Sequence, residues 1–325
     1  MAADDTRAFW IAAPGRGEIR LETLPTPLAD EVVVRALYSG ISRGTEALVF
    51  QGRVPASEYQ RMRAPFQAGE FPGPVKYGYA SVGHIEQGPR ELRGRTVFAL
   101  HPHQTRYVVP ARSVYVVPDA VPAPRAVLAA NLETAVNGVW DARPQIGDRI
   151  VVVGAGTVGC LVAWLAARIV GCEVDLVDVN PRRAAIAREL GVRFAAPDAV
   201  SEGVDVVIHA SGSPEGLALA LRIAAFEATI VELSWYGNQE VPIALGEGFH
   251  ARRLTLKSSQ VGHVAASQRA RWDARRRMQF ALALLAHAEL DKLVTGESDF
   301  DELPRVMADL AVAPGDTLCH RIRYS

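Results

Sequence analysis

Apolar positions change their spacing part-way along this 325-residue chain. Before about residue 120, short apolar and β-branched runs alternate with turns that contain Gly or Pro, a pattern typical of strands. The predicted strands cover residues 31–38, 80–86, 96–100, 107–110 and 113–117. This half of the chain is therefore expected to form a compact β-rich domain.

From about Val121 the pattern predicts alternating helices and strands. Helices are expected over residues 126–140, 158–170, 182–190 and 214–224, and strands over residues 149–153, 173–177, 204–209 and 229–233. These strands are almost wholly apolar, as in parallel sheets that helices cover on both faces. The sequence therefore predicts an α/β fold with a Rossmann doubly wound parallel sheet.

After Gln260 the alternation stops. An Arg-rich helix is expected over residues 268–287, followed by a segment at 299–310 and a strand at 319–324. The last strand has no partner in the alternating region, so it is expected to return to the N-terminal half. The predicted domains are residues 1–120 with 261–325, and residues 121–260.

A glycine-rich turn follows the apolar strand that ends at Val153. Gly154, Gly156 and Gly159 have GxGxxG spacing between a predicted strand and a predicted helix. In this arrangement the first glycine permits a tight turn, the second lets the backbone approach a pyrophosphate, and the third lets helix and strand pack closely. Free N–H groups at the start of the helix attract the phosphates. The stretch therefore predicts a dinucleotide site.

Asp178 ends the next predicted strand, where an acid can accept hydrogen bonds from ribose hydroxyls. A 2′-phosphate beside it would cost about 4 kcal/mol, taking unit charges ~4 Å apart at an effective dielectric of ~20. NAD is therefore expected in preference to NADP. Arg182 and Arg183 could reach such a phosphate, although a solvated first helical turn is the preferred interpretation. The expected cofactor contacts are Gly154, Gly156, Thr157, Val158, Gly159, Asp178, Asn180, Arg183, Ala210, Ser211 and Gly212.

Composition and charge exclude several classes of protein. The net charge of −1 offers no basic field for nucleic acid or a membrane surface. The most apolar helical stretch, 158–170, is short for a membrane span and contains Arg168, and the N-terminus does not read as a signal peptide. Three cysteines without CxxC spacing or a disulfide framework favour a reduced, cytoplasmic protein. The expected partner is a small-molecule substrate.

Four short motifs carry a family resemblance: Ser39-Gly40-Ile41-Ser42, Gly147-Asp148-Arg149-Ile150, Ala210-Ser211-Gly212 and the stretch 254–260. They resemble the medium-chain dehydrogenase/reductase superfamily over nearly the whole chain. The resemblance implies a discontinuous GroES-like catalytic domain, a Rossmann domain, a homodimer, and NAD(P)-dependent transfer of hydride between a secondary alcohol and its ketone. Residues 39–46 are most similar to the zinc-less subgroup that contains bacteriochlorophyllide dehydrogenase.

Zinc-dependent members of the superfamily carry a Cys soon after the Gly-Ile pair, a Gly-His-Glu motif and often a four-cysteine lobe. Here the Cys position falls on Ser42 or Arg43, the second motif is Gly78-Tyr79-Ala80, and the lobe is absent. A catalytic zinc usually needs three thiolate, imidazole or carboxylate ligands. The nearby candidates have no recognised ligand spacing: Glu46, His84, His101, His103 and Glu133. The resemblance therefore implies a zinc-independent enzyme.

Without zinc, side chains must move the alcohol proton and stabilise the developing alkoxide. The catalytic candidates are Tyr79, Thr45, Glu46 and Glu133. Tyr79 stands at a ligand position and Lys76 could lower its pKa, but a barrel tyrosine beside a surface lysine is an equal alternative. Thr45 matches the hydroxyl that relays the proton in zinc enzymes, and Glu46 could act as a base. Both residues also suit the start of a helix.

Several other polar residues have two interpretations each. Glu133 is either a base with an elevated pKa or a structural acid paired with an arginine. His101 and His103 line a substrate cleft or, more commonly, belong to a surface loop. A solvated helix face is the preferred interpretation of an arginine cluster, with an anionic substrate group as the alternative. The cluster is Arg269, Arg271, Arg275, Arg276 and Arg277.

Two further activities remain open. One is a zinc-free reductase of activated double bonds or quinones, an activity that usually uses NADPH. The other is a nucleotide-binding protein that kept the fold and lost catalysis together with its metal ligands.

Overall fold

A computed structural model of the chain describes residues 5–325. The chain divides into two compact units, which are described separately. Unit 1 consists of Met1–Ala130 and Leu282–Ser325, and unit 2 is Asn131–Ala281. The predicted domain borders, after residues 120 and 260, fall earlier in the chain than these. Residues 261–281 belong to unit 2, where Arg277 joins Val261 to Glu133 of the first helix of that unit.

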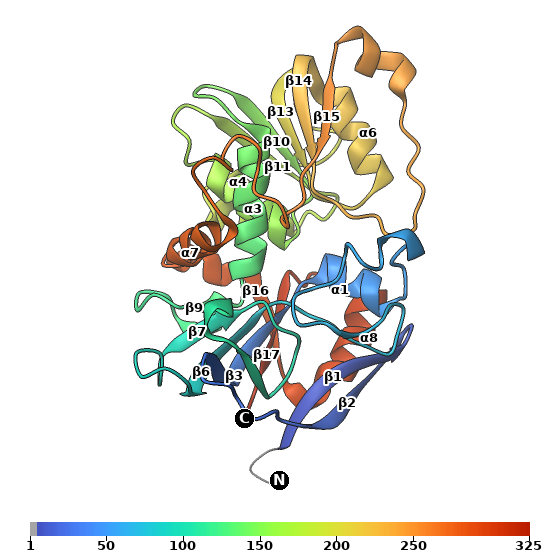
Figure 1. Cartoon of the computed structure of the whole chain (residues 1–325). Helices are drawn as coiled ribbons and strands as arrows, with labels where there is room; N and C mark the ends of the chain where they lie inside the picture. Colours follow the sequence, from blue (N-terminus) through green and yellow to red (C-terminus); the bar gives the residue numbers. More distant parts are fainter. Residues whose placement is uncertain (1–4) are drawn as a thin grey trace. The chain divides into compact units, whose positions relative to one another are not determined.

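Unit 2 is built on a six-stranded parallel sheet of order β12-β11-β10-β13-β14-β15. Its strands are β10 (Arg149–Val153), β11 (Glu173–Val177), β12 (Arg193–Ala195), β13 (Val204–His209), β14 (Ala224–Glu232) and β15 (Thr255–Ser258). Helix α6 (Pro214–Ile223) covers one face, and α3 (Ala129–Ala142) and α4 (Thr157–Ala166) lie on the other (Figure 1). The predicted Rossmann α/β fold is confirmed.

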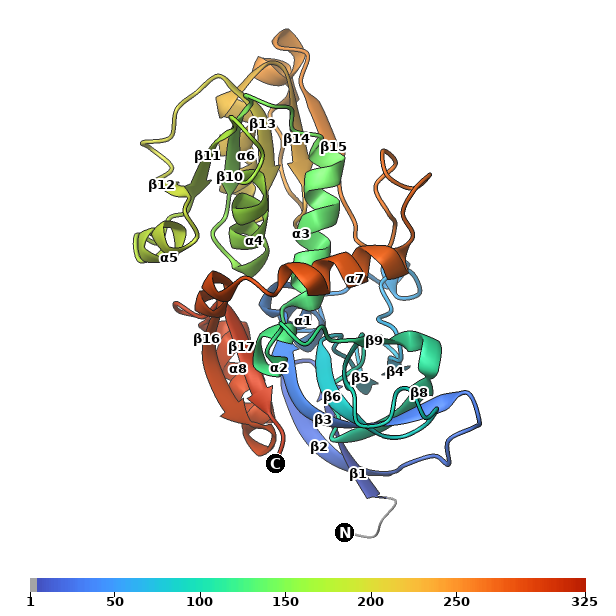
Figure 2. The same ribbon diagram turned by 90° about the vertical axis from the view of Figure 1, so that its left-hand side faces the viewer.

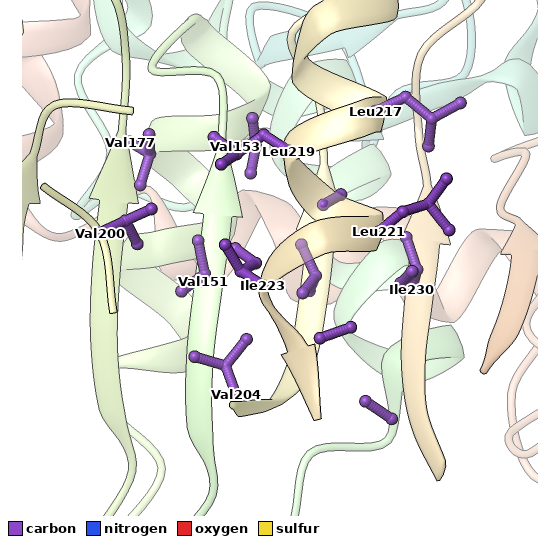
Figure 3. Close-up of a cluster of buried hydrophobic side chains, with 14 of the residues drawn as sticks. Val151, Val153, Val177, Val200, Val204, Leu217, Leu219, Leu221, Ile223 and Ile230 are labelled. Atoms are coloured by element: carbon purple, nitrogen blue, oxygen red, sulfur yellow. The ribbon is translucent and has the colours of Figure 1, made fainter. Parts of the chain in front are cut away.

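The core between α6 and the sheet explains why these segments keep their places. Leu219 and Ile223 of α6 lie beside Val153 and Val151 of β10, as Figure 3 shows, and all four are buried. Burying one such side chain contributes roughly 1.5–3 kcal/mol. Ser213 caps α6 by accepting a hydrogen bond from the Gly216 N–H at 3.2 Å. The packing holds the carboxyl ends of β10 and β13 in register.

Unit 1 contains two sheets, so the predicted β-rich half is confirmed. One has the order β2-β1-β5-β4, and the other has the order β16-β17-β3-β6-β7-β9 with β8 paired to β3. The strands are β1 (Asp5–Ala13), β2 (Arg16–Thr23), β3 (Glu31–Ile41), β4 (Ala68–Gly69), β5 (Val75–Lys76), β6 (Ser81–Gln87), β7 (Thr96–Ala99), β8 (Arg106–Pro110), β9 (Val114–Val116), β16 (Val294–Asp299) and β17 (Cys319–Arg323). The β1–β2 hairpin was not predicted.

The last strand returns to the N-terminal half, as predicted. Strand β17 pairs antiparallel with β3 and parallel with β16, and Figure 2 shows the red C-terminal strands beside blue β3. The register pairs Ile322 with Ser39 and Arg323 with Tyr38. Tyr324 therefore lies close to the middle of a strand that begins near the other end of the chain.

The remaining helices differ in part from the predicted ones. The Arg-rich helix begins at Ala274 instead of Gln268, and residues 266–271 form turns. Helix α5 (Arg183–Glu189) connects β11 to β12 in the Rossmann unit, and the other helices are α1 (Arg43–Phe50), α2 (Ala123–Ala126), α7 (Ala274–Leu284) and α8 (Leu303–Val312). Within residues 5–325, no helix has both the length and the apolar character needed to cross a membrane.

Candidate active site

The glycine turn of unit 2 leaves no space for side chains at two of its positions. Gly154 has φ +106°, and a Cβ there would lie 2.6 Å from the Ser211 backbone. A Cβ on Gly159 would lie 1.8 Å from the Gly154 carbonyl oxygen. The turn and the first residues of α4 are therefore packed as closely as a dinucleotide-binding turn requires.

The start of α4 presents backbone donors. The first N–H groups of a helix have no intrahelical acceptors. In α4, whose N-cap residue is Gly156, no side chain caps them either. Gly156, Thr157 and Val158 are partly exposed, whereas the strand before them is buried. This is the local chemistry that binds a pyrophosphate, and the turn fits a dinucleotide cofactor.

Asp178 is fixed at the carboxyl end of β11 by two backbone donors. The Ala155 N–H donates to its Oδ2 at 2.7 Å, and the Asn180 N–H donates to its Oδ1 at 2.8 Å. The carboxylate is thus tied directly to the glycine turn. A ribose bound to the turn would meet a negative charge and hydrogen-bond acceptors at this point.

Arg183 does not lie in a solvated first turn, so that interpretation is wrong for this residue. It is only 6% exposed, whereas Arg182 is exposed. Burial raises the pKa of the Cys160 thiol to about 12, while the charge of Arg183 opposes this rise and that of Asp178 adds to it. Arg183 therefore lies within the electrostatic reach of the glycine-turn helix and of Asp178.

The loop 210–212 is held next to the glycine turn. The Ala210 N–H donates to the Val153 carbonyl at 2.8 Å, and the Gly212 N–H donates to the Ser234 hydroxyl at 3.0 Å. The Ser211 hydroxyl lies 2.6 Å from Nε2 of His209. These bonds place all three predicted loop residues at the carboxyl edge of the sheet.

A buried histidine behind this loop was missed by the sequence analysis. His209 is fully buried, and its Nδ1 lies 2.7 Å from Oε2 of Glu232. The two residues are paired in register at the ends of neighbouring strands β13 and β14. Knowledge of that register would have brought them together, but the local pattern does not contain it.

Unit 1 contains a buried carboxylate–imidazole pair. Glu46, in the first turn of α1, is 1% exposed. Its Oε1 accepts the Ser42 N–H at 2.8 Å, and its Oε2 lies 2.8 Å from Nε2 of His103. Both carboxylate oxygens are thus engaged inside the unit, and the side chain lies behind the exposed part of the helix start.

The pair extends into a longer hydrogen-bonded chain. Nδ1 of His103 lies 2.7 Å from the Ser39 hydroxyl, which lies 2.8 Å from the Tyr324 hydroxyl. Gly78, with φ +137°, lets the backbone approach the His103 ring, since a Cβ there would lie 3.0 Å from its Cδ2. The surface-loop interpretation is therefore wrong for His103, and also for His101, because both are buried.

Tyr79 lies at the partly exposed side of this cluster. Its phenol is hydrogen-bonded to the side chains of Ser42 and Thr45. Burial raises the pKa of Tyr79 to about 12, with a further increase from Glu46, and the bonds to Ser42 and Thr45 oppose the rise. The structure therefore brings together three of the four predicted catalytic residues, Tyr79, Thr45 and Glu46.

Lys76 does not lower the pKa of Tyr79, so that hypothesis is wrong. The Lys76 ammonium is buried and donates to Glu22 at 2.7 Å and to Gln104 at 2.9 Å. The alternative of a surface lysine is wrong as well, because Lys76 is buried and stabilises the unit through these two bonds.

The fourth candidate, Glu133, lies in unit 2 and is paired with an arginine. Nε of Arg277 donates to Oε1 of Glu133 at 3.0 Å, and both side chains are buried. Burial raises the pKa of Glu133, and Arg277 lowers it. The solvated-face interpretation of the arginine cluster is wrong for Arg277, whereas its other four members are exposed.

The side chains at the family's zinc positions do not fit a catalytic zinc site. Ser42 and Tyr79 are hydroxyl groups bonded to one another, and Glu46 is already bonded through both oxygens. In the part of the chain that the structure describes, no group of three or more His, Cys, Asp or Glu side chains is arranged to hold a metal ion. Zinc requires such ligands.

Comparisons with known proteins show similarity to dehydrogenases. Residues 157–281 match the family model for zinc-binding dehydrogenases. D-guloside 3-dehydrogenase of Escherichia coli is 26% identical over 294 residues, covering 81% of this chain and 83% of the relative. L-threonine 3-dehydrogenase of Deinococcus radiodurans is 26% identical over 256 residues, covering 67% of this chain and 72% of that protein.

Solved structures show the same fold. The structure of L-idonate 5-dehydrogenase from Escherichia coli has a TM-score of 0.80 at 15% identity and covers 98% of each chain. A putative zinc-binding dehydrogenase from Sinorhizobium meliloti, bound to NADP, has a TM-score of 0.78 at 18% identity and covers 98% of this chain and 99% of its own.

The glycine turn and the relatives named dehydrogenases indicate the class of protein, an NAD(P)-dependent oxidoreductase, and the chain has the fold of the solved dehydrogenase structures. Over residues 157–281 the chain is similar to the zinc-binding dehydrogenase family, and over most of its length it is similar to the relatives named above.

Proposed function

We propose that this chain is an NAD(H)-dependent, zinc-independent dehydrogenase that interconverts a secondary alcohol and its ketone, with Tyr79 as the proton donor and acceptor. One observation carries the proposal. Ser42 and Tyr79, at positions where the family has metal ligands, form a hydrogen-bonded set of hydroxyl groups with Thr45, next to a buried Glu46–His103 pair.

The solvent exposure of each side chain indicates whether it can contact a substrate. Tyr79 and Thr45 are partly exposed, so they can touch a substrate oxygen. Glu46 and His103 are each 1% exposed, so they act through the hydroxyl groups in front of them. Tyr79 is the catalytic residue in this scheme, and Glu46 is a positioning residue.

The protonation state of Tyr79 suits ketone reduction. A phenol with a pKa of about 12 keeps its proton at neutral pH and can donate it to an oxygen that gains negative charge. Bound NADH would supply the hydride to the carbonyl carbon. The phenol proton goes to the substrate oxygen, the hydrogen bonds from Ser42 and Thr45 stabilise the phenolate, and a solvent proton restores the phenol. Alcohol oxidation is the reverse sequence.

Asp178 supports NAD as the cofactor. Its carboxylate is held in place by the Ala155 and Asn180 N–H groups, so it cannot turn away from a 2′-phosphate without losing those bonds. The relatives named D-guloside 3-dehydrogenase and L-threonine 3-dehydrogenase support a polar, hydroxylated substrate.

Turnover of a panel of sugar, polyol and hydroxy-amino-acid substrates, with their ketones, tests the proposal. Activity is expected with NADH, to be higher than with NADPH, and to persist after dialysis against a chelator that leaves no measurable zinc. Tyr79→Phe should lower kcat by roughly 10²- to 10⁴-fold without changing the Kd of NADH. Tyr115→Phe, in β9, is the matched control and should retain activity.

Three results would contradict the proposal. Loss of activity on chelation, with recovery on adding zinc, would show that a metal does the chemistry. Full activity of Tyr79→Phe would remove the proposed proton donor. Tight NADH binding without turnover of any substrate would favour a non-catalytic nucleotide-binding protein.

A further inference from the structure

Unit 2 contains a cavity of about 650 Å³ at the end of helix α3. Its apolar walls are formed by Val139, Trp140 and Ile169. Two arginines, Arg143 and Arg271, line it as well. The volume lies within the range of roughly 300–1,000 Å³ that is usual for small-molecule sites.

This cavity is separate from the dinucleotide turn. Arg143 precedes β10 in the chain, close to the amino end of that strand, whereas Gly154 follows its carboxyl end. A strand rises about 3.3 Å per residue, so the ends of five-residue β10 are roughly 13–16 Å apart. The cavity and the glycine turn therefore lie at opposite edges of the same sheet.

The charge of the cavity is one-sided. It is lined by two arginines and by no carboxylate. Arg269, Arg275 and Arg276 are exposed nearby in the same segment. Guanidinium groups bind carboxylates, sulfonates and phosphates through paired, charge-assisted hydrogen bonds. The cavity is therefore complementary to an anionic group.

Aromatic rings give the cavity a flat apolar wall. Trp140 lines it, and the Trp140 ring lies 5.0 Å from that of Trp272, centroid to centroid. The guanidinium of Arg276 lies 3.9 Å above the Trp272 ring, which fixes the outer member of the pair. A planar apolar body can pack on Trp140 while its anionic group reaches the arginines.

Arg143 adopts a strained backbone conformation at this site. It follows the last residue of α3 with φ +54°, and its N–H donates to the Val139 carbonyl at 3.0 Å. Glycine is the usual residue at such a helix end, because a side chain is unfavourable at positive φ. The helix end does not require an arginine, and the arginine present here lines the cavity.

We propose that this cavity is a binding site for a small anionic molecule with a planar apolar body, such as an aromatic carboxylate, sulfonate or phosphate. The site is independent of the dinucleotide and of the proposed dehydrogenase reaction. Both ligands bind to the same unit at the same time.

Fluorescence titration with anilinonaphthalene sulfonate, on the full chain saturated with NADH, tests this site. Saturable binding of one probe molecule per chain is expected. Arg143→Gly and Arg271→Gln should each weaken it at least tenfold, whereas the neighbouring exposed Arg269→Gln, the matched control, should weaken it less than threefold. Benzoate and phenyl phosphate, as competitors, show which anionic group the site prefers.

Thermal unfolding separates a binding role of Arg143 from a structural one. Arg143→Gly relieves the positive φ, so its Tm is expected to rise while probe binding falls. A lower Tm would show that the side chain stabilises the fold and would overturn the proposal. Three other results would also overturn the proposal. They are weaker probe binding with NADH present than without it, equal losses of probe affinity in all three variants, and the absence of saturable binding.

Discussion

Replacing Arg277 by Met should destabilise unit 2 strongly, because this one side chain satisfies several buried acceptors. The guanidinium is 2% exposed. It donates to Glu133 and Asn137 on α3, and also to the carbonyls of Val261 and His263. Arg277 therefore fastens the segment after β15 to the first helix of the unit.

The expected loss follows from what remains after the substitution. Removing one member of a buried ion pair typically costs about 3–5 kcal/mol, because the other charge is left without compensation. For a unit of this size, about 4 kcal/mol corresponds to a fall in Tm of roughly 8–16 °C. Met fills most of the volume of the Arg stem, so the loss is due mainly to the buried carboxylate of Glu133 and the unpaired carbonyls.

The deficit should also depend on pH. Burial already raises the pKa of Glu133 in the folded unit, and Arg277 is the group that lowers it. Without Arg277 the folded-state pKa rises further above its unfolded value, so the folded variant takes up a proton first as the pH falls. The difference in free energy of unfolding between wild type and variant should therefore be larger at about pH 8 than at about pH 5.5.

Urea denaturation followed by circular dichroism measures this difference. Arg275→Met, an exposed arginine of the same helix, is the matched control and should change the free energy of unfolding by less than about 1 kcal/mol. A second variant, Glu133→Leu with Arg277→Met, removes both charges and should recover more than half of the loss. Equal stability of Arg277→Met and Arg275→Met would refute the reasoning.

Three further substitutions test the site and its supports. Burial lowers the pKa of His101 to about 3, so the folded chain loses up to about 1.4 kcal/mol of stability per pH unit below about 6.5. His101→Phe keeps a ring against Tyr107 and should reduce the fall in the free energy of unfolding with decreasing pH, measured by urea titration. An unchanged dependence on pH would contradict the lowered pKa of His101. Gly78→Ala combines a positive φ with a contact to the His103 ring, and its urea midpoint should fall by an amount equivalent to about 1–3 kcal/mol. Asp178→Ala should narrow the ratio of the Kd values of NADPH and NADH at least tenfold in fluorescence titrations; an unchanged ratio would show that another group selects the cofactor.

The sequence alone determined the dinucleotide unit. Gly154, Gly156, Gly159 and Asp178 lie within one strand–turn–helix–strand stretch, so their relation depends on local spacing and on the regular geometry of these elements. The apolar composition of the strands likewise predicts a parallel sheet, although it does not predict which strands are neighbours. A local pattern is sufficient wherever the interacting groups are neighbours in the chain.

Tertiary structure decided the buried hydrogen-bonded cluster that contains Glu46 and His103. Ser39 and Tyr324 are 285 positions apart, and Glu46 and His103 are 57 apart. They meet only because β17 pairs with β3 in one register and the segment after β7 passes under α1. Each residue type by itself is ordinary in a turn or at a helix start, so the local pattern could not distinguish side chains buried in one cluster from polar side chains in contact with water.

The arginines give the same lesson within one helix. Arg275, Arg276 and Arg277 follow one another in the sequence, yet the first two are exposed and the third is buried against Glu133, 144 positions away. Helical geometry turns successive side chains by about 100°, so only one of the three can face α3. Which one does so depends on how the helix packs, and the free energy of that packing comes from groups distant in the chain.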